Sequence, residues 1–280
     1  VRSLERELAA VCRKVALKVV KEGKEQKLEI RGADVPTYLG VPKFRLGKKE
    51  EHDAIGLTHG LSVSDHGGDI LDCEVSVVAG KGKLVITGLL EKGMEESAQA
   101  AMSYIRSRSA ILKLDPDFYQ KVDVHVHFPD FVRKDGPSAG VTMATSIASA
   151  LTRVPVRNEV AMTGEITLRG RVMPIGGLKE KLLAAHRNGI TTVLVPKENR
   201  KDLREIPRRV LKTLRVVLVD HMDEVLREAM VFPEPDTLFG PRRSLIEYRN
   251  GELIEEDAPA SSAARTVLPG DAPGEQPGLS

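Results

Sequence analysis

The stretch Asp135-Gly136-Pro137-Ser138-Ala139-Gly140 decides how the sequence is interpreted, because it opens an apolar run that ends near Leu151. Apolar residues recur in this run at the three- and four-residue spacing of a helix. Proline is favoured at the first position of a helix, so Pro137 predicts a helix start with Ser138 in the first turn. There the hydroxyl lies among backbone N–H groups at the positive end of the helix. Such a position suits a nucleophilic serine beside an oxyanion-binding site.

Two other interpretations of Ser138 remain open on this stretch alone. A serine near a helix start is commonly an N-cap. A glycine-rich turn before a helix also binds phosphate, or merely reverses the chain. A catalytic interpretation therefore requires a second residue that can act as the base.

The base for a nucleophilic serine is either a histidine or a lysine. His186 lies at the far end of the helix predicted over residues 178–188. A lysine acts as a base only where burial lowers its pKa, and Lys181 lies at the margin of the apolar face of that helix. The spacing favours Lys181 over Lys179. A solvated lysine that buries only its stem is the alternative.

Composition restricts the class of protein. The 280 residues are 41% hydrophobic and 29% charged, with a net charge of +2, which is ordinary for a soluble globular protein and low for a nucleic-acid binder. Cys12 and Cys73 cannot form a disulfide framework or a four-ligand zinc site, and they favour a reducing compartment. With no apolar run long enough for a membrane span and no signal peptide, we expect no membrane contact and a cytoplasmic piece of a longer chain.

The pattern along the chain predicts a mixed fold, part α+β and part α/β. Strands and helices alternate after residue 158, which implies an α/β layer. The extended runs in residues 55–88 predict a hairpin sheet, and Gly80-Lys81-Gly82-Lys83 predicts a hairpin turn because it lacks the spacing of a phosphate loop. Residues rich in Pro, Gly, Ser, Ala and Glu follow Phe232 and predict disorder. We expect helices over 3–22, 93–112, 178–188 and 222–230, strands over 122–128, 159–163, 191–195 and 214–219, and a hairpin about Gly170.

Two histidines, His125 and His127, lie on one face of the strand predicted over 122–128. Such a pair could bind a metal ion. No third ligand is evident, so we expect a structural or supporting role and no metal site.

Several long motifs resemble the proteolytic domain of Lon proteases. The resemblance covers residues 1 to about 230, and its motifs are ordered and specific. They are Lys134–Gly140, Met162–Gly170, Pro174–Ala185, His125-Val126-His127, Asp117-Phe118-Tyr119 and the Gly80–Lys83 turn.

The resemblance implies a Ser-Lys dyad in which Ser138 is the nucleophile and Lys181 the general base. It places Thr163 and Glu165 beside the dyad. It also identifies Asp135 with the family's acidic residue before the nucleophile, which is linked to switching the site on and off.

Further residues complete the expected site. His125 and His127 are expected to support it. Phe131 and Val132 are bulky apolar neighbours that need a burial site, either in a substrate pocket, in a subunit contact or in the core. An oxyanion and substrate loop is expected from Gly136, Pro137, Ala139 and Gly140, together with Phe131.

The resemblance also implies a domain organisation. Residues 1–33 are expected to end the helical subdomain of an AAA+ ATPase module, 34–50 to form a linker, 51–232 to form the Lon proteolytic domain, and 233–280 to form a disordered tail. No phosphate-loop motif is present, so we expect no cofactor in this segment, and ATP with Mg in the rest of the ATPase module. Family members form six-membered rings and degrade unfolded or damaged proteins in quality control and stress responses.

Two departures from the family pattern put substrate preference in doubt. Members often carry Gly-Leu-Ala-Trp where this chain has Gly56-Leu57-Thr58-His59, and the loop before the nucleophile is bulky over residues 129–133. Two other functions stay open: a Lon-fold interaction module with an idle site, and weak DNA binding. The basic residues that suggest DNA binding, which we interpret as a solvated face, are Arg200, Lys201, Arg204, Arg208, Arg209 and Lys212.

Overall fold

The computed structural model describes residues 2–23, 28–40, 52–64, 67–129, 136–242 and 244–257, and it divides the chain into two units, 1–47 and 48–280. Within these described ranges, no helix combines the length and the apolar character that crossing a membrane requires.

The N-terminal unit is built on the helix α1 (Arg2–Glu22), which confirms the helix predicted there. A 3-10 turn, η1 (Gly32–Asp34), and the short helix α2 (Val35–Leu39) follow, and Lys14 Nζ donates a hydrogen bond to the carbonyl of Tyr38. Apolar side chains on two faces of α1 stay more than half exposed: Leu4 and Leu8 lie on one face, and Leu17 and Val20 on the opposite face.

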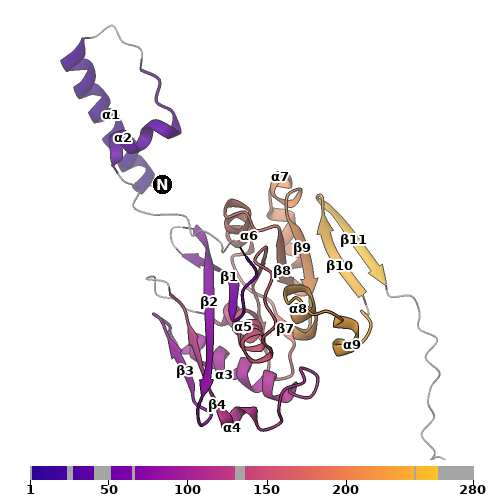
Figure 1. The fold of residues 1–280 in the computed structure, drawn as a ribbon. Helices are drawn as coiled ribbons and strands as arrows, with labels where there is room; N and C mark the ends of the chain where they lie inside the picture. The colour runs from indigo at the N-terminus through magenta and orange to yellow at the C-terminus, as the bar shows by residue number, and fades with distance from the viewer. Residues whose placement is uncertain are drawn as a thin grey trace, which may run out of the picture. The chain divides into compact units, whose positions relative to one another are not determined.

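The second unit is organised by one mixed sheet (Figure 1). In the described part of the chain the sheet has nine strands in the order β11-β10-β9-β8-β5-β1-β2-β4-β3. The centre, β1-β5-β8-β9, is parallel, and the β1-β2, β2-β4, β9-β10 and β10-β11 pairs are antiparallel. The strands are β1 (Leu57–Ser64), β2 (Gly67–Ala79), β3 (Leu84–Thr87), β4 (Val122–His127), β5 (Val160–Met162), β8 (Thr192–Pro196), β9 (Arg215–Val219), β10 (Ser244–Arg249) and β11 (Glu252–Asp257).

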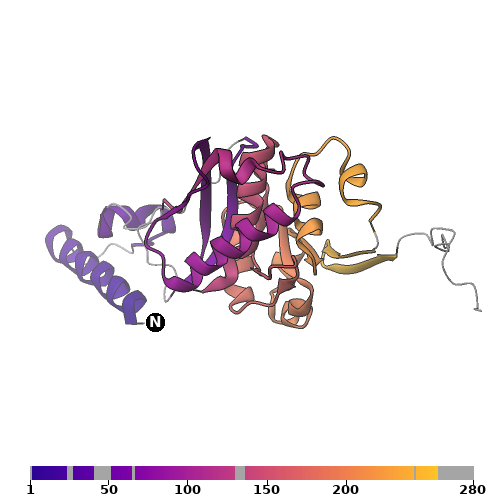
Figure 2. The ribbon, with the colours of Figure 1, turned by 90° about the horizontal axis from the view of Figure 1, so that it is seen from below.

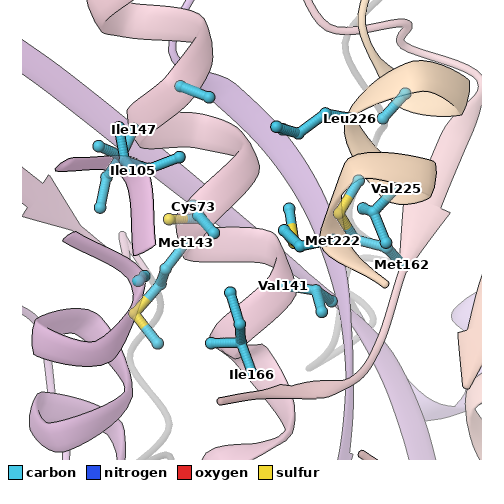
Figure 3. Packing of buried hydrophobic residues seen from close by; sticks show 14 of the residues in the cluster. Cys73, Ile105, Val141, Met143, Ile147, Met162, Ile166, Met222, Val225 and Leu226 are labelled. Carbon is cyan, nitrogen blue, oxygen red and sulfur yellow. The ribbon is translucent and has the colours of Figure 1, made fainter. Parts of the chain in front are cut away.

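Helices cover both faces of the parallel centre, and β5, β8 and β9 there are largely apolar, as expected for strands buried on both faces. In β8, Leu194 packs into one core, and its neighbours Val193 and Val195 pack into the other. Helices α3 (Lys92–Ser107), α5 (Gly140–Thr152) and α8 (Met222–Ala229) contribute to the first core, in which their apolar side chains point toward one another (Figure 3). The second core takes side chains from α6 (Leu178–Arg187), the 3-10 helix η3 (Lys197–Glu205) and α7 (Arg208–Leu211).

Three smaller elements complete the unit: α4 (Phe118–Lys121), α9 (Pro235–Phe239) and a separate hairpin of β6 (Glu165–Ile166) with β7 (Val172–Met173). The hairpin expected about Gly170 is therefore confirmed. The predicted fold class, a mixed α/β domain with a large mixed sheet and flanking helices, is confirmed as well.

The prediction that Gly80–Lys83 is the turn of a β-hairpin is wrong. Strands β2 and β3 are not paired with each other, because β4 lies between them and pairs with both. Asp123 of β4 explains the turn, since its Oδ1 accepts hydrogen bonds of 2.8 Å from the backbone N–H groups of Lys81 and Lys83. The turn is therefore held by a side chain distant in the sequence and not by hydrogen bonds between β2 and β3.

The prediction of disorder after residue 232 is wrong for α9 (Pro235–Phe239), β10 (Ser244–Arg249) and β11 (Glu252–Asp257). Figure 2 shows this orange-to-yellow segment at one side of the core, and β10 pairs with β9 to extend the sheet. The sequence did contain an indication of this hairpin, because Asn250 (φ 57°) and Gly251 (φ 81°) form the two-residue turn typical of a tight hairpin. The prediction of disorder relied instead on the high content of Pro, Gly, Ser, Ala and Glu in this segment. Residues 258–280 lie outside the described residues.

A buried carboxylate fixes this C-terminal hairpin to the body. Glu247 of β10 is only 1% exposed. It accepts a 2.6 Å hydrogen bond from Arg215 of β9 and forms a 2.6 Å ion pair with Arg249 of its own strand. Arg215 also pairs with Glu228 of α8 at 2.9 Å. The network therefore joins the hairpin, the sheet edge and α8.

Replacing Glu247 by glutamine is expected to lower the free energy of unfolding by about 1.5–3 kcal/mol, because two arginines lose a charged acceptor. Urea unfolding measures the change. Glu256→Gln on β11 is the matched control, since Glu256 is exposed. Equal, small effects of both substitutions would show that the Glu247 network does not hold the hairpin.

Candidate active site

Ser138 lies in a single 3-10 turn, η2 (Pro137–Ala139), that leads directly into α5. Gly136 before it has a φ of 93°, which favours glycine, and Pro137 then begins the turn as predicted. The α-helix itself begins two residues after the serine, at Gly140. Ser138 is therefore half-buried at the start of a helix, rather than inside its first α-turn.

The backbone around Ser138 is clamped by the segment after β5. Gly164 N donates a 2.9 Å hydrogen bond to the Ser138 carbonyl, and Val141 N donates one of 3.2 Å to the Gly164 carbonyl. A side chain at Gly140 would lie 2.8 Å from the Ile166 side chain, so glycine is required for this close approach. These contacts of Gly164 and Ile166 could not be predicted from the sequence, because both connect segments that are distant in the chain.

Lys181 brings its amine to this serine from α6. The residue is 3% exposed, and Nζ donates hydrogen bonds to Ser138 Oγ (3.0 Å) and to Thr163 Oγ1 (2.9 Å). Thr163 follows β5 and is fully buried, with its N–H bonded to the Leu194 carbonyl at 3.1 Å. Its hydroxyl therefore holds the amine from a rigid strand end.

Burial lowers the pKa of the Lys181 amine to about 8. Desolvation is the cause, because both hydrogen-bond partners are neutral hydroxyls and removing an ammonium group from water penalises the charged form. A substantial fraction of the amine is therefore neutral in mildly alkaline solution. A neutral amine in contact with a serine hydroxyl can accept its proton.

The structure brings together only some of the residues expected at the site. Glu165 lies on β6 and is half-buried, and it has no described hydrogen bond to Lys181. His125 and His127 lie on β4, where both rings bond to Thr87 Oγ1 (2.8 and 2.7 Å) instead of reaching the dyad.

Asp135 and Phe131 lie outside the described residues, so their expected positions are not described. Of the other loop residues, Ala139 is buried and Pro137 is exposed. Among the described residues there is no group of three or more His, Cys, Asp or Glu side chains that could hold a metal ion.

Comparison with known sequences identifies the family of this chain. Residues 29–232 match the sequence model of the Lon protease (S16) C-terminal proteolytic domain, and residues 1–28 match that of the Lon protease AAA+ ATPase lid domain. The chain belongs to the Lon protease family. Residues 29–232 are thus a Lon proteolytic domain, and the domain is that of a protease.

Named relatives agree with this assignment. The chain is 65% identical over 277 residues to Lon protease 3 of Sorangium cellulosum, covering 98% of this chain and 33% of that protein. It is 56% identical over 266 residues to Lon protease 1 of Syntrophobacter fumaroxidans, covering 95% and 32%. With Lon protease 1 of Myxococcus xanthus the identity is 54% over 264 residues, covering 94% and 32%. The chain spans about a third of the length of these relatives.

The depressed pKa of Lys181 predicts a pH-dependent stability. An unfolded lysine titrates near 10.4, so between pH 8 and that value the unfolded state binds more protons than the folded state. The free energy of unfolding should therefore rise across this interval, by about 3 kcal/mol from this group. The difference between wild type and Lys181→Met, measured by urea unfolding from pH 7 to 10.5, isolates it. A difference that does not change with pH would contradict a lowered pKa.

Proposed function

We propose that this chain is the proteolytic part of a serine endopeptidase that uses a Ser138–Lys181 dyad. The observation that carries the proposal is the 3.0 Å contact between Lys181 Nζ and Ser138 Oγ, together with the pKa of about 8 for that amine. Burial supplies the neutral base that a serine nucleophile needs.

The proposed reaction passes one proton through Lys181 in each of its two halves. The neutral Lys181 amine takes the proton of the Ser138 hydroxyl while Oγ attacks the carbonyl carbon of the peptide bond. The resulting ammonium gives that proton to the departing amine, which leaves an ester on Ser138. Lys181 then accepts a proton from water, whose oxygen attacks the ester, and returns it to Oγ as the acid product is released.

The neighbouring groups are proposed to orient the dyad. The Thr163 hydroxyl accepts one amine N–H, which leaves the nitrogen lone pair free to face Ser138. The start of α5 offers the positive end of a helix to the oxyanion that forms on the attacked carbonyl. No charged partner on Lys181 is needed in this scheme.

The activity of the whole protein is proposed from the family. The match of residues 1–28 to a Lon lid domain supports an ATPase module in the longer protein, which would use ATP and Mg to unfold substrates. Unfolded or damaged proteins as substrates, a six-membered ring and a cytoplasmic location belong to the same proposal. The roles of Asp135, Phe131, Glu165, His125 and His127 stay predictions.

The alternative functions receive less support. An idle interaction module would not need a buried amine in contact with a serine hydroxyl. DNA binding through the basic residues of η3 and α7 has no observation in its favour, and Arg200 there is already paired with Glu255 at 2.6 Å.

Replacing Ser138 by alanine is expected to abolish cleavage of unfolded casein and of short peptides by the chain, because the nucleophilic oxygen is removed. The melting temperature should stay near that of wild type, since Ser138 is only half-buried. Ser107→Ala is the control, because the Ser107 hydroxyl bonds only to the Tyr104 carbonyl of its own helix. Near-normal cleavage by purified Ser138→Ala would exclude Ser138 as the nucleophile.

Phosphonylation of Ser138 by a serine-reactive fluorophosphonate probe, with loss of fluoride, should become faster as pH rises through about 8, where the Lys181 amine loses its proton. Ser138 in the Lys181→Arg variant should be labelled at least about 100-fold more slowly than in wild type at every pH, because a guanidinium group does not release its proton. Intact-mass measurement follows the labelling. A rate that is flat between pH 6 and 10 would argue against Lys181 as the base.

A further inference from the structure

The position of the catalytic lysine depends on how α6 begins. Gly177, the residue before α6, has a φ of 66° and offers no side-chain cap, and the Gly176-Gly177 pair before the helix is conformationally free. The first hydrogen bond of the helix runs from Lys181 N to the Gly177 carbonyl, at 3.1 Å. A shift of this segment therefore moves the backbone of Lys181 itself.

Apolar packing alone does not fix the helix along its axis. Leu178, Leu182 and Ala185 bury α6 in the second core, and such contacts are non-directional. The segment before α6 follows β7, which is only two residues long. Directional contacts hold the far end of α6, where Arg187 Nη2 donates a 2.6 Å hydrogen bond to the Gly68 carbonyl and His186 Nδ1 lies 2.9 Å from Thr213 Oγ1. At the start of α6, such contacts must come from another element.

Asn199 of η3 supplies these contacts. The residue is 2% exposed. Its Oδ1 accepts a 3.0 Å hydrogen bond from Ile175 N, and its Nδ2 donates one of 2.8 Å to the Ile175 carbonyl. One side-chain amide thus binds both backbone groups of a residue that lies two positions before Gly177.

Asp202 sets the orientation of this amide. Asn199 Nδ2 also donates a 2.6 Å hydrogen bond to Asp202 Oδ2, one turn later in η3. A carboxylate has no hydrogen to donate, so the NH₂ group must face Asp202, and the carbonyl oxygen then faces Ile175 N. The amide therefore has a single orientation.

We propose that Asn199, oriented by Asp202, is a positioning residue for Lys181. It fixes the start of α6 so that the amine reaches Ser138 and Thr163 while remaining out of water. This inference rests on the proposed dyad. Neither residue has any described contact with the reacting groups, so both act through the backbone from Ile175 to Lys181.

The proposal is tested by comparing the kcat of Asn199→Ala with that of a control variant, Asn188→Ala. Asn188 is a matched control, because its Nδ2 also bonds to a backbone carbonyl, that of Ala184, but at the far end of α6 from Lys181. We expect Asn199→Ala to lower kcat for a short peptide by about 10- to 100-fold with KM nearly unchanged, since misplacing a reacting group by about 1 Å has effects of this size. Asn188→Ala should leave kcat within about twofold of wild type.

The pH profile of Ser138 labelling separates positioning from a general loss of structure. A displaced amine would contact water, so its pKa should rise and the midpoint of labelling should move above that of wild type. Asp202→Ala should shift the midpoint in the same direction, and it provides the test if Asn199→Ala does not fold.

Two results would overturn the inference. One is a folded Asn199→Ala or Asp202→Ala variant with wild-type kcat and labelling midpoint. The other is an equal loss in Asn188→Ala. If wild-type Ser138 is not labelled at any pH, the dyad itself is refuted and the positioning role is refuted with it.

Discussion

The burial of one lysine amine is the constraint on which the site depends. Lys181 Nζ has two neutral hydroxyls as partners, at 2.9 and 3.0 Å, and its side chain is almost completely removed from water. In this setting the charged form of the amine is penalised, and no carboxylate among the described residues offsets that penalty. The fold must therefore keep the amine buried, in a place where its charged form is unfavourable, and must also keep it in contact with Ser138.

Three segments from different parts of the sheet meet to do this. The chain after β4 brings Ser138 to the start of α5, the end of β5 brings Thr163, and the chain after β7 starts α6 and brings Lys181. Apolar cores on both faces of the parallel centre fix these helices in direction. The hydrogen bonds of the Gly164 and Ile175 backbones add directional contacts to this packing.

The sequence predicted the local parts of this arrangement well. Gly136-Pro137 before an apolar run was enough to place Ser138 at a helix start, and the spacing within 178–188 was enough to prefer Lys181. It did not predict contacts between distant segments, such as Asp123 with the Gly80–Lys83 turn or Asn199 with Ile175. The C-terminal hairpin was missed for another reason: its composition resembled that of a disordered tail, although Asn250-Gly251 marked its turn.

Direct titration of the Lys181 side chain tests the central claim most directly. In lysine-selective NMR of the chain, with resonances followed from pH 6 to 11, the account predicts one lysine that titrates near pH 8 and whose signal is absent from Lys181→Met. If every lysine, Lys181 included, titrates near the ordinary value of about 10.4, the buried amine is not a neutral base and the account is contradicted.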